Sequence, residues 1–296
     1  MNNLHGTVVA AFGRQYEVRL DGGEILLCFP RGKKSLLAVG DRLVVERTGS
    51  DRGVVVSSEA RSSLLYRSDQ FRQKLIAANV TQLILVTATE PGFSTELLSR
   101  CAAAAESQDM KVAIILNKAD LTDKLPAARD MLTSFRALGY PLLEMAALAG
   151  GEHLGPLKAL LKGETSVLVG QSGMGKSTLI NALIPDAAAR TREISEYLDS
   201  GKHTTTFSRL YQLDDTSALI DCPGVQEFGL AHMSRGEIES GFPEFRPHLG
   251  RCRFRDCRHD REPDCALKAA IKAGSITTER FNHFMRAVTE AGKNQS

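Results

Sequence analysis

Three short motifs in this 296-residue chain combine residue types that are suited to binding a nucleotide. Each unites small or flexible residues with a charged or amide side chain. They are Asn117-Lys118-Ala119-Asp120, Gly170-Gln171-Ser172-Gly173-Met174-Gly175-Lys176-Ser177 and Asp221-Cys222-Pro223-Gly224. In that order they match an NKxD guanine reader, a Walker A loop and a DxxG motif, so the chemistry that they predict is GTP binding and hydrolysis.

The Walker loop predicts the phosphate site. Gly170, Gly173 and Gly175 let backbone N–H groups turn inward around phosphate oxygens, and the following helix adds the positive end of its dipole. We expect Lys176 to reach the β- and γ-phosphates and the Ser177 hydroxyl to bind Mg²⁺. The remaining residues of the predicted phosphate site are Gln171, Ser172, Met174 and Thr178.

Asn117, Lys118 and Asp120 predict the base site. A carboxylate at Asp120 can accept from the N1–H and N2–H₂ donors of guanine, which adenine lacks. The Asn117 amide can join the base to the Walker loop, and the Lys118 stem can cover the base face. A companion loop is expected around residues 145–147, where its motif is indistinct. NKxD alone is a weak signal, and it gains strength from the Walker loop.

The hydrolytic residues are expected in the third motif and in the segment that precedes it. Asp221 should bind Mg²⁺ through water, and the Gly224 N–H should contact the γ-phosphate. The segment Gly201-Lys202-His203-Thr204-Thr205-Thr206 reads as a switch, in which Thr204 or Thr205 completes the Mg²⁺ shell. Val225 stands where Ras-like enzymes place a water-orienting Gln, so His203 becomes the nearest catalytic candidate, with a merely solvated loop histidine as the alternative.

The order of the motifs is reversed relative to most GTPases, since the guanine reader precedes the Walker loop. Residues 68–230 alternate strands and helices, which predicts a mostly parallel sheet. Expected strands are 82–87, 111–116, 165–169 and 217–220, and expected helices are 94–107, 126–138 and 176–183. All three motifs then follow strand ends, where open α/β sheets bind ligands. The central domain is therefore predicted to be a circularly permuted α/β P-loop GTPase.

Residues 1–67 predict a small all-β domain. Five short β-rich runs, separated by turn residues, fit a barrel of the OB type, with an SH3-like barrel as the alternative. The runs are 7–10, 16–20, 25–29, 42–46 and 53–56.

Residues 231–296 predict a mainly α module, with helices at 266–273 and 278–288, that binds a metal. Cys252, Cys257, His259 and Cys265 lie within fourteen residues, and Cys₃His is a common structural zinc set. Their spacing is not that of a Cys₂His₂ finger, so the ligand types carry the interpretation. We expect one structural Zn²⁺ per chain, with three free thiols and a surface histidine as the alternative.

Charge and composition restrict the partners. The net charge of +2 is uninformative, but residues 246–286 carry ten Lys/Arg against five Asp/Glu, and residues 1–67 carry ten against seven. Basic modules at both ends, with Phe254 among arginines, suggest RNA, although an ordinary solvated surface would also be basic. No secretory signal or membrane-length apolar run is evident, so a cytoplasmic, membrane-free monomer is expected.

On these motifs the chain resembles the circularly permuted, small-ribosomal-subunit-dependent GTPases of the RsgA, or YjeQ, type. The resemblance spans essentially the whole length, and 254–259 with Glu262-Pro263 is characteristic of it. It implies that the OB-fold and the zinc module contact rRNA, that the small subunit stimulates hydrolysis late in its maturation, and that His203 assists. A GTP-gated RNA-binding protein with incidental hydrolysis, or a P-loop kinase, are the competing hypotheses.

Overall fold

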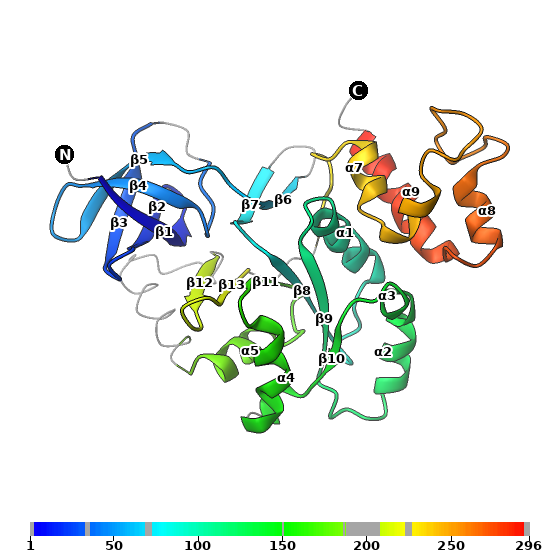
Figure 1. Cartoon of the computed structure of the whole chain (residues 1–296). Helices are drawn as coiled ribbons and strands as arrows, with labels where there is room; N and C mark the ends of the chain where they lie inside the picture. The colour runs from blue at the N-terminus through cyan, green and yellow to red at the C-terminus, as the bar shows by residue number, and fades with distance from the viewer. Residues whose placement is uncertain are drawn as a thin grey trace.

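The computed structural model describes residues 3–32, 36–68, 73–149, 151–185, 187, 208–222 and 227–292. A barrel formed by the N-terminal strands lies at one side of a central α/β layer, and a helical C-terminal module lies at the other (Figure 1). The expected order of all-β, α/β and mainly α parts is therefore present.

Five strands form the barrel, and β2 to β5 alternate buried residues with partly or fully exposed ones. They are β1 (Asn3–Phe12), β2 (Gln15–Leu20), β3 (Ile25–Pro30), β4 (Arg42–Arg47) and β5 (Arg52–Ser58). The long strand β1 pairs with both β2 and β4, and β3 runs parallel to β5, so the order β1-β2-β3-β5-β4 closes on itself. This is the OB arrangement rather than the SH3-like alternative.

A two-stranded hairpin, which the sequence did not reveal, follows the barrel. It consists of β6 (Leu64–Ser68) and β7 (Gln73–Ala78), and it forms a sheet of its own. The expected boundary at residue 67 falls inside β6. The hairpin lies between the barrel and the C-terminal module in Figure 1, so it is placed to contact both.

The central sheet has the order β10-β9-β8-β11-β13-β12, and every adjacent pair is parallel except β13–β12. Its strands are β8 (Gln82–Ala88), β9 (Lys111–Asn117), β10 (Leu142–Glu144), β11 (Thr165–Val169), β12 (Arg209–Gln212) and β13 (Ala218–Asp221). Strand β8 is buried throughout, as expected for a parallel strand covered on both faces. The β8–β11 pair joins the half that comes first in the chain to the half that carries the Walker loop.

Helices cover this sheet, and their ends follow local chemistry. They are α1 (Thr95–Glu106), α2 (Leu125–Met131), α3 (Thr133–Ala137), α4 (Gly155–Leu161) and α5 (Lys176–Leu183). Ser94 caps α1 by accepting from Leu97 N, so the helix proper begins one residue after its expected start. The single helix expected over 126–138 is wrong, because the chain breaks at Leu132. The Thr133 hydroxyl donates to the Arg129 carbonyl, a bond that competes with the regular helix ladder.

The barrel and the central sheet are joined edge to edge. Ala10 of β1 is paired with Arg209 of β12, which makes one continuous eleven-stranded sheet. The Arg209 guanidinium lies 3.1 Å from a Glu17 carboxylate oxygen, so an ion pair supports this junction. Strand β12 follows directly after the segment expected to be the switch.

The C-terminal module packs against α1. It contains α7 (Arg235–Ser240), η3 (Pro243–His248), α8 (Ala266–Lys272) and α9 (Thr278–Gly292), so the last helix extends beyond its expected end at 288. Arg280 of α9 is almost fully buried, with its Nε 2.7 Å from Glu244 Oε1 and its Nη1 donating to Ser99 Oγ of α1. Because a buried charge must be paired, the Glu244 contact ties α9 to η3, and the hydrogen bond to Ser99 joins α9 to the central domain.

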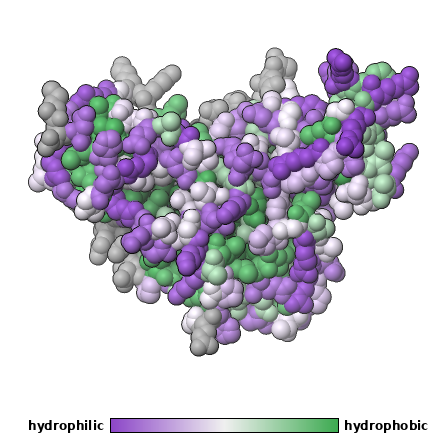
Figure 2. Space-filling view, viewed as in Figure 1, coloured by the Kyte–Doolittle hydropathy of each residue, from purple (hydrophilic) through white to green (hydrophobic). Residues whose placement is uncertain are grey.

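The surface of the C-terminal module differs from that of the central layer. Figure 2 shows hydrophilic residues gathered over the outer loops of the C-terminal module, whereas hydrophobic colour shows over the central layer. Within the described residues, no helix combines the length and apolar character that crossing a membrane requires.

Candidate functional site

The strands that precede the three motifs end at one edge of the central sheet. Strand β9 ends at Asn117, β11 leads into Gly170, and β13 ends at Asp221. Because these strands are parallel, their carboxyl ends meet at the same edge, which is where ligands bind in such sheets.

The Walker loop has the backbone conformation that its glycines allow. Gly173 and Gly175 have φ of +82° and +90°, which other residues rarely adopt. The largely buried Lys176 donates from Nζ to the carbonyls of Gly170, at 2.6 Å, and Gln171, at 2.9 Å. Its ammonium group is thus held over the loop, at the start of α5.

Asn117 lies against this loop. Its Nδ2 donates to Met174 O at 3.0 Å, and its Oδ1 accepts from Ala147 N at 3.0 Å. A Cβ on Gly175 would lie 2.1 Å from Asn117 Nδ2, so the glycine permits this close approach. The Asn117 side chain therefore connects the Walker loop to the loop around 145–147, which was only indistinct in sequence.

A segment that the sequence did not single out, residues 89–94, braces both motifs. Lys118 has a φ of +57° and donates from Nζ to Glu90 O at 2.7 Å, and Thr89 Oγ1 donates to Lys118 O. Ser94 N donates to Gln171 Oε1 at 2.9 Å, so the Gln171 side chain faces α1. No sequence pattern marks these contacts, because they join residues up to 77 positions apart.

Two opposite charges interact within the site. Burial raises the pKa of the half-buried Asp221 carboxyl, and the Lys176 charge opposes that shift. Burial lowers the pKa of Lys176, and Asp221 in turn opposes that shift. Each ion thus stabilises the charged form of the other, as expected of groups arranged around a phosphate and its cation.

The other predicted site residues divide into two sets. Ser172, Ser177 and Asp120 are exposed, and Thr178 is half-buried in the first turn of α5, so all four lie at the surface of this edge. His203, Thr204, Thr205, Thr206 and Gly224 lie outside the described residues.

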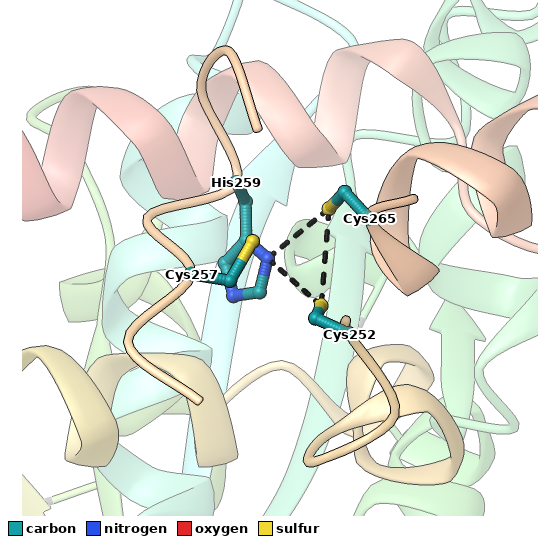
Figure 3. Close-up of side chains that lie close together, drawn as sticks. All are labelled: Cys252, Cys257, His259 and Cys265. Atoms are coloured by element: carbon teal, nitrogen blue, oxygen red, sulfur yellow. Dashed lines mark hydrogen bonds between the residues drawn. The ribbon is translucent and has the colours of Figure 1, made fainter. Parts of the chain in front are cut away.

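The four predicted metal ligands come together in the C-terminal module. The ligand atoms of Cys252, Cys257, His259 and Cys265 all lie within 4.8 Å of one another (Figure 3). His259 Nδ1 is 3.2 Å from Cys265 Sγ and 3.6 Å from Cys252 Sγ, and the two sulfurs are 4.0 Å apart.

These distances fit a tetrahedral ion. Metal–sulfur bonds of about 2.3 Å and metal–nitrogen bonds of about 2.0 Å place tetrahedral ligands roughly 3.5–3.8 Å apart. The backbone N–H of Ala266 also points to Cys252 Sγ at 3.3 Å, an arrangement that stabilises a thiolate. The cluster can therefore hold a metal ion.

Comparison with known proteins identifies the family. The family model described as RsgA GTPase matches residues 58–231, which is more than half of the chain. The chain belongs to the RsgA GTPase family. It is thus a GTP-hydrolysing enzyme, as the motifs predicted.

Similar proteins support this assignment over the full length. A protein of Burkholderia pseudomallei (strain K96243), named small ribosomal subunit biogenesis GTPase RsgA, is 53% identical over 290 residues, covering 97% of this chain and 92% of its own. A protein of the same name from Ralstonia nicotianae is 51% identical over 292 residues, with the same coverage.

Solved structures share the fold. The crystal structure of YjeQ from Thermotoga maritima matches with a TM-score of 0.74 and 29% identity, covering 98% of this chain and 99% of that one. The structure of YloQ, described as a circularly permuted GTPase, matches with a TM-score of 0.69 and 24% identity, covering 100% and 97%. The circular permutation expected from the motif order is confirmed.

Proposed function

We propose that this GTPase acts on the small ribosomal subunit as a late assembly factor, and that the subunit stimulates its hydrolysis of GTP. The observation that carries the proposal is the Asn117 bridge between the guanine-reader motif and the Walker loop, in a chain flanked by a barrel and a metal module. The names of two relatives, small ribosomal subunit biogenesis GTPase RsgA, support the small subunit as the partner.

The nucleotide site would use the residues placed at the sheet edge. Asp120 and Asn117 read guanine, Lys118 covers the base, and the Walker loop with Lys176 holds the phosphates. Mg²⁺ would be bound by Ser177 and, through water, by Asp221, with Thr204 or Thr205 completing its shell. His203 would assist the attacking water, and Gly224 would sense the γ-phosphate.

The nucleotide state would reach the rest of the protein through the segment that follows the DxxG motif. Gly229 O accepts from Ser68 N of the β6–β7 hairpin at 3.2 Å, and Arg67 donates to Glu227 O at 2.9 Å. Ser68 Oγ also lies 3.0 Å from His232 Nδ1. A switch that moves residues 227–229 would therefore act on the hairpin, and through Ser68 on His232, which precedes α7. We infer that GTP favours binding to the subunit and that hydrolysis favours release.

RNA contacts would come from the two end modules. In the C-terminal one, Arg246 pairs with Glu106 and Arg280 with Glu244, so part of the basic charge is neutralised within the fold. Arg251 and Arg255 are exposed and form no ion pair with a described residue. They therefore remain available to phosphate groups.

Phe254 offers a different kind of contact. It is the most exposed Phe or Tyr among the described residues, and the Arg253 guanidinium lies 5.6 Å from its ring centre. An exposed aromatic ring braced by arginine is a surface on which an unpaired base can stack.

The metal cluster would hold one structural Zn²⁺, because four Cys and His ligands at tetrahedral spacing leave no open position. The domains would span residues 1–67, 68–230 and 231–296, with the hairpin as the junction between the first two. We further propose that the protein is a cytoplasmic monomer that exchanges GTP and GDP.

Turnover measured with and without purified small subunits tests this function. We expect phosphate release from GTP to be slow alone and faster with small subunits, and unchanged with large subunits as the control. Binding to small subunits should also weaken steeply as salt rises, because phosphate contacts release counterions. Equal turnover in all three conditions would contradict the proposal and favour a GTP-gated RNA-binding protein.

A further inference from the structure

The metal cluster has a fifth neighbour that is absent from its sequence motif. Glu239 belongs to α7, and its Oε1 lies 3.3 Å from Nε2 of His259. The imidazole faces the cysteine sulfurs with its other nitrogen, Nδ1. His259 is buried and Glu239 is largely buried, so this contact is shielded from bulk water.

Glu239 is itself held in place. Arg235, one turn earlier on α7, donates from Nε to Glu239 Oε1 at 2.9 Å. The same guanidinium donates to the carbonyl of Arg258, next to His259, and lies 5.5 Å from the centre of the Phe284 ring. The Glu239 carboxylate is therefore oriented by its contacts with Arg235 and His259.

We propose that Glu239 is a positioning residue for the metal site. Its carboxylate accepts the Nε2–H of His259, which leaves Nδ1 unprotonated and directed at the ion. A histidine that binds a metal usually donates its other N–H to such a partner, which orients the ring and makes the ligand more basic. This inference rests on the proposed Zn²⁺ and extends it, because it adds an anchor from a helix outside residues 252–265.

The anchor has a structural consequence. Residues 252–265 contain few regular elements, whereas α7 begins with a complete capping box formed by Ser234 and Glu237. Glu239 thus ties the loop that carries the metal ligands to a helix whose start is capped. That helix follows directly after Leu230 and His232, which contact the β6–β7 hairpin. Metal binding would therefore fix the position of α7 as well as the loop.

Zinc competition on the full-length protein tests this role. The variants are Glu239→Ala, Glu239→Gln and, as a control, Glu237→Gln. The control removes the same charge from the same helix and keeps a side chain that can complete the capping box. Zn²⁺ affinity is measured against a chromogenic chelator, and GDP binding by each variant verifies that the central domain is folded.

We expect Glu239→Ala to weaken Zn²⁺ binding by about 10–100-fold, the usual effect of removing such a partner. Glu239→Gln should recover part of this loss, because its amide oxygen still accepts a hydrogen bond, and Glu237→Gln should stay within about twofold of the wild type. Co²⁺ bound in place of Zn²⁺ should show altered absorption bands in Glu239→Ala, since the imidazole is no longer oriented.

Two results would overturn the inference in different ways. Affinity within about twofold of the wild type, with an unchanged Co²⁺ spectrum, would show that Glu239 does no more than pair with Arg235. Absence of Zn²⁺ uptake by the wild type would refute the zinc site itself, and this role with it. If Glu239→Ala does not fold, the same comparison is made with Glu239→Gln, which is nearly isosteric.

Discussion

Replacing Asn117 by Ala should weaken both the fold of the central domain and its affinity for guanine nucleotides. The side chain is 2% exposed and makes two hydrogen bonds to backbone groups, Met174 O and Ala147 N. Alanine removes both bonds and leaves a buried acceptor and a buried donor without partners. Each such orphaned group costs about 1–3 kcal/mol. The free energy of unfolding should therefore fall by about 2–6 kcal/mol.

The affinity for GDP should fall for the same reason. Met174 belongs to the Walker loop and Ala147 to the companion base loop, so Asn117 holds both loops in register. We expect GDP affinity to fall at least tenfold, which corresponds to about 1.4 kcal/mol. Gly175→Ala should also lower GDP affinity, because the new Cβ would lie 2.1 Å from Asn117 Nδ2 and displace that side chain. The φ of +90° at this position adds backbone strain for alanine. Thermal unfolding and titration with a fluorescent GDP derivative measure the two effects.

Asn79 supplies the matched control. Its side chain also makes two hydrogen bonds with backbone groups, accepting from Ser62 N and donating to Gly40 O, but it lies at the junction of the barrel and the hairpin. Asn79→Ala should lower stability and leave GDP affinity unchanged. If Asn117→Ala left GDP affinity at the wild-type value, or cost less than about 1 kcal/mol of stability, the assigned role of this bridge would be wrong.

Three further outcomes follow from single side chains. Asp120→Asn should shift the preference of the site from guanine toward xanthine nucleotides, measured by competition, and unchanged selectivity would refute its role as base reader. Arg280→Met should destabilise the protein by about 3–5 kcal/mol in chemical denaturation, because it leaves the buried Glu244 carboxylate unpaired, and adding Glu244→Gln should restore part of the loss. Burial lowers the pKa of His232 to about 4, below its usual 6.5, so the unfolded chain binds a proton more readily. The free energy of unfolding should therefore fall by about 1–2 kcal/mol as pH falls from 6.5 to 4, after allowing for solvent screening. His232→Gln should reduce this loss. An equal pH dependence of stability in the wild type and the variant would contradict the assignment.

Much of the fold could be predicted because local patterns and topology agree. The barrel strands and α5 were found from turn residues and apolar runs, and each motif followed a strand end as predicted. The sequence does not reveal the β6–β7 hairpin, because the residues that connect its strands, 69–72, carry no tight two-residue turn signal. The break at Leu132 was missed because the competing bond from Thr133 is a side-chain choice that apolar periodicity does not report.

The candidate site also contains residues that the sequence predicts and residues that it does not. Residue types and spacing predict the Walker loop, Asn117, Asp120, Asp221 and the four metal ligands as site residues, because each has a chemistry that few other residues can supply. The structure places Asn117 against the Walker loop and brings the four Cys and His ligand atoms together. Residues 89–94 and Glu239 carry no comparable signature. Their contacts depend on distance in space, and glutamate is common on any helix surface.

The sequence by itself determined the nucleotide chemistry, the order of the domains and the circular permutation. These depend on residue identity and on position along the chain, both of which are present before folding. Only the tertiary structure decided that Asn117 bridges two loops, that residues 89–94 brace them, and that Glu239 faces His259. Those relations arise when parallel strands bring their carboxyl ends to one edge, and when α7 and the metal loop pack against α9. Such packing depends on the summed burial of many side chains, which no short stretch of sequence specifies.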